Sequence, residues 1–142
     1  MTHYDTSKLY ISYVEDVLSG VIPASKNIKL ACARFKSWFD RDDIYFDYDD
    51  VDRRIRVVSR IKHWKGKSAG KPFILLPYQQ WIFASLFGFK YVSTGFRVTK
   101  KALIFCARKS GKTALAAAIC ITQLLLDNNM GQEVDFVANS GK

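Results

Sequence analysis

Hydrophobic and polar positions follow a helical period in the N-terminal part of the chain. In residues 6–18, apolar side chains recur every three or four positions, and Gly20 follows where a helix C-cap is expected. A second pattern of this kind begins after Pro23, with Ser25 in position to cap it and aromatic residues along its apolar side. We therefore predict two amphipathic helices, and we expect the aromatic side of the second to serve packing rather than base stacking.

An acidic cluster, DYDDVD at residues 47–52, precedes the basic stretch RRIRVVSRIKHW. Grouped carboxylates suit metal binding or acid/base catalysis. Acidic residues at the start of a helix and cations towards its end also complement the helix dipole, and this is the interpretation we favour. The sequence GKSAGKP, at residues 66–72, then breaks the periodicity and predicts an exposed loop.

The pattern changes character beyond this loop. Pro77 is placed for the first turn of a helix that runs to Gly88, and residues 94–100 suggest a turn or a short strand. An apolar run at 102–106 then leads through a polar turn into an Ala/Leu-rich helical stretch, and a second apolar run follows at 134–138. Strand, helix and strand in this order predict a βαβ unit with parallel strands and a right-handed crossover.

The turn between the first strand and the helix carries the chemistry, because residues 106–113 read CARKSGKT. Backbone N–H groups without intrahelical acceptors and the positive end of the dipole make a helix N-terminus a site for anions. Gly111 would let a phosphate approach the backbone. Lys112 would reach the β- and γ-phosphates of a nucleotide, and the Thr113 hydroxyl would ligate Mg²⁺.

The loop departs from the usual phosphate-loop pattern at its first position, where Cys106 stands in place of glycine. Arg108 lies four residues before Lys112. From this position its guanidinium would reach the γ-phosphate as an arginine finger supplied in cis. The alternative is that Arg108 and Lys109 are solvated loop cations, and the residues alone leave both interpretations open.

The segments LLPYQQWIF, CARKSGKT and EVDFVANS together resemble the N-terminal part of the ATPase domain of tailed-phage terminase large subunits, the DNA-packaging motors. That family typically has a deviant Walker A motif, which lacks the early glycine and carries an arginine before Gly-Lys-Ser/Thr. Arg108, Lys112 and Thr113 fall on those positions. The resemblance implies that these residues, with Ser110 and Gly111, bind the phosphates of MgATP.

The resemblance also implies a role for a glutamine upstream of the loop. In terminases, as in helicases, such a glutamine contacts adenine, and Gln79 is the closest match, with Gln80 as an adjacent competitor. A glutamine amide offers a donor and an acceptor to the N6/N7 edge of adenine, and Tyr78 would stack on the ring. Without the resemblance, Gln79 reads equally well as a surface residue of an amphipathic helix.

Charge and composition narrow the class of protein further. The chain has 142 residues, is 49% apolar and carries a formal net charge of +9, and no acidic residue occurs between Asp52 and Asp127. Such a field attracts a polyanion, DNA or RNA. The sequence shows no apolar run long enough for a membrane span and no secretion signal, so we expect a cytoplasmic protein, in the host cell if the resemblance holds. With only His3 and His63 and no CxxC pair, we expect no zinc site.

These observations predict an α/β protein. Residues 1–70 would form an N-terminal helical subdomain or lead-in, and 71–142 the start of a P-loop ATPase core of the ASCE type, with a truncated parallel sheet. ATP hydrolysis in this class needs an Asp on a later strand that holds Mg²⁺ through water, followed by a Glu that polarises the attacking water. Neither residue is assigned in this sequence. We therefore expect this chain alone to bind ATP and Mg²⁺ without hydrolysing ATP.

The resemblance implies that the full subunit couples ATP hydrolysis to packaging of double-stranded DNA into a procapsid. It would work as a homo-oligomeric ring with a small terminase subunit and the portal protein as partners, and would carry a C-terminal nuclease domain. Two alternatives remain open from the residues. One is another P-loop nucleic-acid motor, such as a helicase, and the other is a non-catalytic, basic nucleic-acid-binding or assembly protein.

Overall fold

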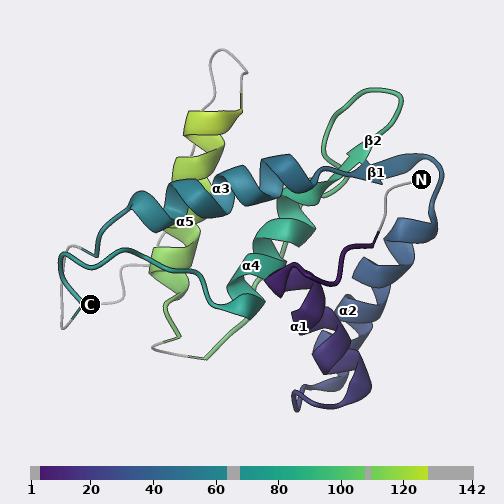
Figure 1. Ribbon diagram of the computed structural model, residues 1–142, viewed down its shortest axis with the longest axis horizontal. Helices are drawn as coiled ribbons and strands as arrows, with labels where there is room; N and C mark the ends of the chain where they lie inside the picture. Colours follow the sequence, from purple (N-terminus) through teal and green to yellow (C-terminus); the bar gives the residue numbers. More distant parts are fainter. Residues whose placement is uncertain (1–3, 64–67, 108–109, 128–142) are drawn as a thin grey trace. The chain divides into compact units, whose positions relative to one another are not determined.

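The computed structural model describes residues 4–63, 68–107 and 110–127, and the chain forms two compact units, Met1–Phe105 and Cys106–Lys142. The first unit contains most of the secondary structure, and the second contains one described helix (Figure 1). The elements of the first unit are α1 (Leu9–Ser19), α2 (Lys26–Ser37), the 3-10 turn η1 (Trp38–Asp40), β1 (Ile44–Phe46), α3 (Tyr48–Arg60), α4 (Pro77–Phe83), the π-helical turn η2 (Ala84–Gly88) and β2 (Phe89–Tyr91). The helix of the second unit is α5 (Lys112–Leu126). Within the described residues, no helix is both long and apolar enough to cross a membrane.

The two N-terminal helices confirm the predicted amphipathic pair. α1 ends at Gly20, whose φ of 87° is the left-handed conformation that glycine adopts without a steric penalty. α2 begins after Ser25, whose hydroxyl accepts a hydrogen bond from the backbone N–H of Ile28. The helices pack against each other, as Figure 1 shows. α1 starts at Leu9, somewhat later than the predicted range of 6–18.

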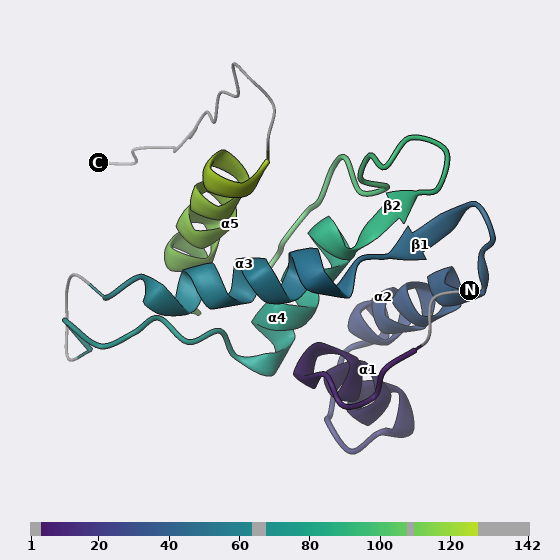
Figure 2. The same cartoon turned by 45° about the horizontal axis from the view of Figure 1, so that its top comes forward.

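The acidic cluster begins α3, as the dipole argument predicted. Asp47 is the N-cap, and its carboxylate accepts a 2.9 Å hydrogen bond from the backbone N–H of Asp50. α3 contacts α4 and η2, and it lies across α4 in Figure 2. The described part of the following loop, residues 68–72, is exposed as expected. Residues 64–67 lie outside the described part of the chain.

Pro77 stands at the first turn of α4, as predicted, and the helical path continues to Gly88. Its last turn, η2, is π-helical rather than α-helical. At Gly88 the chain passes directly against the ring of Phe46, because a Cβ placed on this residue would lie 2.2 Å from the Cε2 atom of that ring. The absence of a side chain at Gly88 therefore permits β2 to begin beside β1.

A short antiparallel sheet joins two segments that are far apart in the sequence. β1 pairs with β2 in the register Ile44↔Tyr91, Tyr45↔Lys90 and Phe46↔Phe89 (Figure 2). Each strand has three residues, which is too few for an alternating pattern to be recognised. This sheet was not predicted, and the only sheet formed by the described residues is this antiparallel one.

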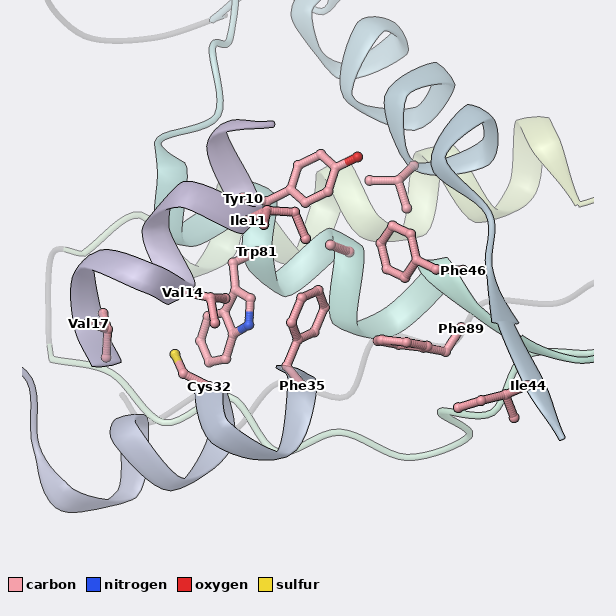
Figure 3. Packing of buried hydrophobic residues seen from close by; sticks show 12 residues of the cluster. Tyr10, Ile11, Val14, Val17, Cys32, Phe35, Ile44, Phe46, Trp81 and Phe89 are labelled. Carbon is pink, nitrogen blue, oxygen red and sulfur yellow. The ribbon is translucent and has the colours of Figure 1, made fainter. Parts of the chain in front are cut away.

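The core of the first unit is rich in aromatic rings. Phe35, Phe46 and Phe89 meet in edge-to-face pairs with ring centroids 4.8–5.9 Å apart, so α2 is held against the sheet. Figure 3 shows these rings beside the indole of Trp81 from α4 and the aliphatic side chains of α1. The aromatic side of the second helix is thus used for packing, as predicted.

The predicted parallel sheet is not present in the described residues. Residues 101–107 belong to no strand, although 102–106 were predicted to form one. A strand is defined by hydrogen bonds to a neighbour, and these residues have no ladder partner in the described part of the chain. In the predicted 94–100 segment, Arg97 makes a single bridge to Lys90. The second predicted strand, 134–138, lies outside the described residues.

Candidate nucleotide-binding site

The second unit shows how the CARKSGKT segment enters its helix. Gly111 adopts φ 76° and ψ 17°, a left-handed conformation, and α5 begins at the next residue, Lys112. The Gly111 carbonyl accepts the backbone N–H of Leu115 at 3.0 Å, which closes the first helical turn. The N–H groups of the residues before Leu115 precede the first intrahelical bond and are the ones that a helix N-terminus offers to an anion.

The lysine at the start of the helix turns back towards the loop. The Lys112 ammonium donates a 2.7 Å hydrogen bond to the backbone carbonyl of Cys106, and the Ser110 hydroxyl donates one of 2.7 Å to the carbonyl of Ala107. These contacts tie the end of the loop to its beginning. No sequence pattern predicts the Lys112 contact, because its acceptor is a backbone carbonyl that any residue could supply.

Thr113, the second residue of α5, has an exposed side chain, as does Lys112. Arg108, the predicted arginine finger, lies outside the described residues, as does Lys109. The predicted roles of Arg108 in phosphoryl transfer and of Thr113 in Mg²⁺ binding therefore stay predictions.

Gln79 occupies the third position of α4 and is buried, with 5% of its surface exposed. Its Oε1 atom accepts a 2.9 Å hydrogen bond from the backbone N–H of Leu76, the residue before the helix. A glutamine at this helix position commonly satisfies an N-terminal N–H in this way. Its Nε2 atom has no hydrogen-bond partner among the described residues. The interpretation of Gln79 as an ordinary surface residue is therefore wrong, and its amide nitrogen is left to donate.

The competing glutamine, Gln80, is also buried, at 9% exposure, and its Nε2 atom donates a 3.0 Å hydrogen bond to the Leu75 carbonyl. One of the two N–H donors of Gln80 Nε2 is thus used within the fold, whereas the Nε2 of Gln79 has no hydrogen-bond partner among the described residues. Tyr78 is half-buried. Its stacking on adenine stays a prediction.

The structure brings part of the predicted site together. Ser110, Gly111, Lys112 and Thr113 form one continuous turn at the start of α5, in the second unit. Gln79 belongs to the first unit.

The chemistry of the loop suits a nucleotide phosphate and its magnesium ion. The left-handed glycine leaves backbone N–H groups uncovered, the Lys112 ammonium supplies a positive charge with three donors, and the Thr113 hydroxyl is an oxygen ligand of the kind that Mg²⁺ takes. An exposed loop that ends in a left-handed glycine and a helix headed by lysine and threonine is typical of phosphate-binding sites.

One known protein family matches the part of the chain that contains this loop. Residues 77–142 match the family described as terminase large subunit, ATPase domain. The matched segment contains Gln79 and every loop residue from Cys106 to Thr113, so the resemblance predicted from the sequence is confirmed over this segment. Searches of curated proteins and of solved structures found no match.

Proposed function

We propose that this chain binds MgATP as the N-terminal ATPase part of a terminase large subunit, the motor that couples ATP hydrolysis to packaging of double-stranded DNA into a procapsid. One observation carries the proposal: the terminase ATPase family match over residues 77–142 contains both the candidate phosphate loop and the candidate adenine contact. The left-handed Gly111 at the head of α5 supports it, because this is the backbone that a phosphate can approach closely.

In this proposal the loop residues divide the work on the triphosphate. Backbone N–H groups of Ser110 and Gly111 and of the first turn of α5 bind phosphate oxygens, and Lys112 exchanges the Cys106 carbonyl for the β- and γ-phosphates. Thr113 ligates Mg²⁺. Arg108 stabilises the charge that develops on the γ-phosphate during transfer.

Gln79 would contact the adenine base. Because its Oε1 is held by the Leu76 N–H, the side chain is already oriented, and Nε2 is the atom left to donate to adenine N7. The remaining lone pair of Oε1 would accept from the N6 amino group. Selectivity for adenine over guanine follows, since guanine presents the O6 acceptor where adenine presents the N6 donor.

Further parts of the proposal concern the whole motor. Hydrolysis requires an acidic residue that holds Mg²⁺ and a second that polarises water, and neither is assigned in this chain. The full subunit would carry a nuclease domain, assemble as a homo-oligomeric ring in the host cytoplasm, and work with a small terminase subunit and the portal protein.

The test is binding of a fluorescent ATP analogue with Mg²⁺, with phosphate release followed in parallel. We expect the unchanged chain to bind and Lys112→Ala to bind at least about tenfold more weakly, because a charged hydrogen bond contributes about 1.5–3 kcal/mol. Lys26→Ala, an exposed lysine on α2, is the matched control and should bind normally. No phosphate release is expected from this chain alone.

Gln79→Glu tests the adenine contact without removing the helix cap. A glutamate still accepts from the Leu76 N–H, but it lacks the amide donor. We expect the variant to lose preference for ATP over GTP in competition assays. If the unchanged chain binds no nucleotide while it and Lys112→Ala share the same salt-sensitive DNA affinity, the ATPase proposal fails and the non-catalytic nucleic-acid-binding alternative replaces it.

A further inference from the structure

Asp47, Asp50 and Asp52, at the start of α3, form ion pairs with an arginine of α3 itself and with lysines of other parts of the chain. Burial of these groups is partial, and each pair is within direct contact distance. The pairs are Asp47 with Lys90 (2.7 Å), Asp50 with Lys90 (3.0 Å), Asp50 with Arg54 (3.0 Å) and Asp52 with Lys8 (2.5 Å). Asp47, Asp50 and Asp52 therefore pair with cations other than those on the outer face of α3, whereas Asp49 of the same cluster is exposed.

The outer face of α3 carries three arginines in one row. Arg53, Arg56 and Arg60 are spaced by three and four residues, so they share one side of the helix, and all three are exposed. This side is opposite the one that buries Val51 and Val58. We call these three residues the arginine row.

The arginine row has no counter-ion in the described part of the chain. No side-chain hydrogen bond or ion pair of the described residues involves its guanidinium groups. Two acidic side chains lie one helical turn before members of the row: Asp49, which is exposed, precedes Arg53, and Asp52, which pairs with Lys8, precedes Arg56. The field of the row is therefore directed to solvent, where it can attract an anion.

The length of the row suits a nucleic-acid backbone. At 1.5 Å of rise per residue, the row extends over about 10 Å. One strand of a duplex presents a phosphate about every 3.4 Å along the axis, so this length spans about three phosphates. Guanidinium groups bind phosphate oxygens with two parallel hydrogen bonds, which suits these arginines to that contact.

The composition of the row selects among anionic partners. A protein interface typically has an apolar or aromatic centre, and the row consists of charged side chains. Proteins that hold single strands stack bases on aromatic side chains, and the aromatic residues of α3 do not extend beyond Tyr48 at its first position. The arginine row therefore suits the backbone of a duplex, which a protein can bind through its phosphates without contacting the bases.

We infer that the arginine row on α3, formed by Arg53, Arg56 and Arg60, contacts the phosphate backbone of double-stranded DNA without reading its sequence. The choice of DNA over other duplexes rests on the proposed function. The contact itself needs no nucleotide in the α5 loop. This assigns a DNA-binding surface to the part of the chain that precedes the family match at residues 77–142.

The test measures binding of the full chain to a fluorescent DNA duplex at several salt concentrations. The variant Arg53→Gln/Arg56→Gln/Arg60→Gln should bind at least about tenfold more weakly at moderate salt. Its slope of log K against log salt should fall by about 2.7, because each lost phosphate contact removes about 0.9. Circular dichroism should show an unchanged fold, since the substituted side chains are exposed.

The matched control removes the same charge from another helix. Lys26→Gln/Lys29→Gln/Arg34→Gln changes three exposed cations on α2 and should alter the slope by less than one contact's share. Equal losses in both triple variants would overturn the inference, because net charge alone would then explain binding. Unchanged binding in the row variant would also overturn it, and would point to an acidic protein partner. Tighter binding to single strands than to duplex would exclude the duplex backbone.

A further measurement distinguishes failure of the DNA contact from failure of the proposed ATP binding. Lys112→Ala should keep the DNA affinity and salt slope of the unchanged chain, because its lysine is not in the row. If the row variant loses DNA while the unchanged chain binds no ATP, the DNA surface stands and the ATPase proposal fails. If ATP binds normally and the row variant keeps its DNA affinity, the ATPase proposal stands and the inferred DNA surface is wrong.

Discussion

Both faces of α3 carry arginine, but the arginine on the inner face is buried and ion-paired, whereas those on the outer face are exposed. Arg54 is 2% exposed, pairs with Asp50 and lies with its guanidinium carbon 4.0 Å from the centre of the Phe87 ring. Its neighbour Arg53 is exposed and faces solvent. The net charge of a basic segment thus overstates the positive charge that is available to a binding partner, because some of its cations form ion pairs and ring contacts within the fold.

The inner face extends beyond α3 through Lys90, on β2. Burial alone would lower the pKa of Lys90, but its hydrogen bonds with Asp47 and Asp50 outweigh burial and raise the pKa above its ordinary value. Burial likewise opposes ionisation of Asp47, yet the hydrogen bonds from Lys90 and from the Asp50 N–H hold its pKa below the usual value. The cap of α3 and the sheet are therefore joined by charge.

Removal of Arg54 should have the largest effect. Arg54→Ala leaves Asp50 with less compensation in a mostly buried position and removes the packing on Phe87. We expect a loss of about 3–5 kcal/mol in the free energy of unfolding, typical of a broken buried ion pair. Arg53→Ala, on the exposed face, should change it by less than about 0.5 kcal/mol. Urea denaturation measures both, and equal effects would contradict the distinction between the faces.

Lys90→Met should be the next most harmful change. The methionine keeps most of the aliphatic stem but removes the ammonium that serves both Asp47 and Asp50. We expect a loss of about 2 kcal/mol by urea denaturation, since a hydrogen bond to a charged group contributes about 1.5–3 kcal/mol. Lys62→Met, at an exposed position after α3, is the control and should be close to neutral. A neutral Lys90→Met would mean that the carboxylates find other partners.

The lowered pKa of Asp47 predicts a smaller, pH-dependent effect. A carboxyl group whose folded pKa lies below its unfolded value, about 3.9, stabilises the fold above that pH, and this contribution is lost as the pH falls through the folded pKa. Asp47→Asn keeps a good helix cap but does not titrate. We expect the variant to be about 1 kcal/mol less stable at pH 7, allowing for partial exposure of the pair, and the gap to close below pH 4. A gap that persists in acid would assign the loss to the cap instead.

The sequence predicted the parts of the fold that local interactions decide. Gly20, Ser25, Asp47 and Pro77 mark helix ends through backbone conformation and nearby hydrogen bonds, and all four hold these places in the structure. The pairing of β1 with β2 was not predicted, because it depends on two short segments that meet only in the folded chain. The run at 102–106 has strand-forming residues, but those residues form a strand only with a neighbour.

The candidate site divides in the same way. The spacing of Gly111, Lys112 and Thr113 predicted a loop followed by a helix, and the structure starts α5 at Lys112. The state of Gln79 could not be read from the sequence, because its burial and its bond to the Leu76 N–H depend on how α4 packs. The ion pair of Arg54 with Asp50 was not predicted, although their spacing of four residues on a helix was a signal for it.

Asp49 gives the smallest and most selective test of the outer face. It lies one turn before Arg53 on the same side of α3, so its carboxylate opposes an approaching phosphate. Asp49→Asn should tighten DNA binding by about two- to threefold, because an exposed pair of like charges interacts weakly in water. It should also cost about 0.5 kcal/mol of stability, since an acidic residue in the first turn complements the helix dipole. Opposite changes in affinity and stability from one substitution would separate the role of this face in binding from its role in folding. An unchanged DNA affinity would place the duplex away from the start of α3.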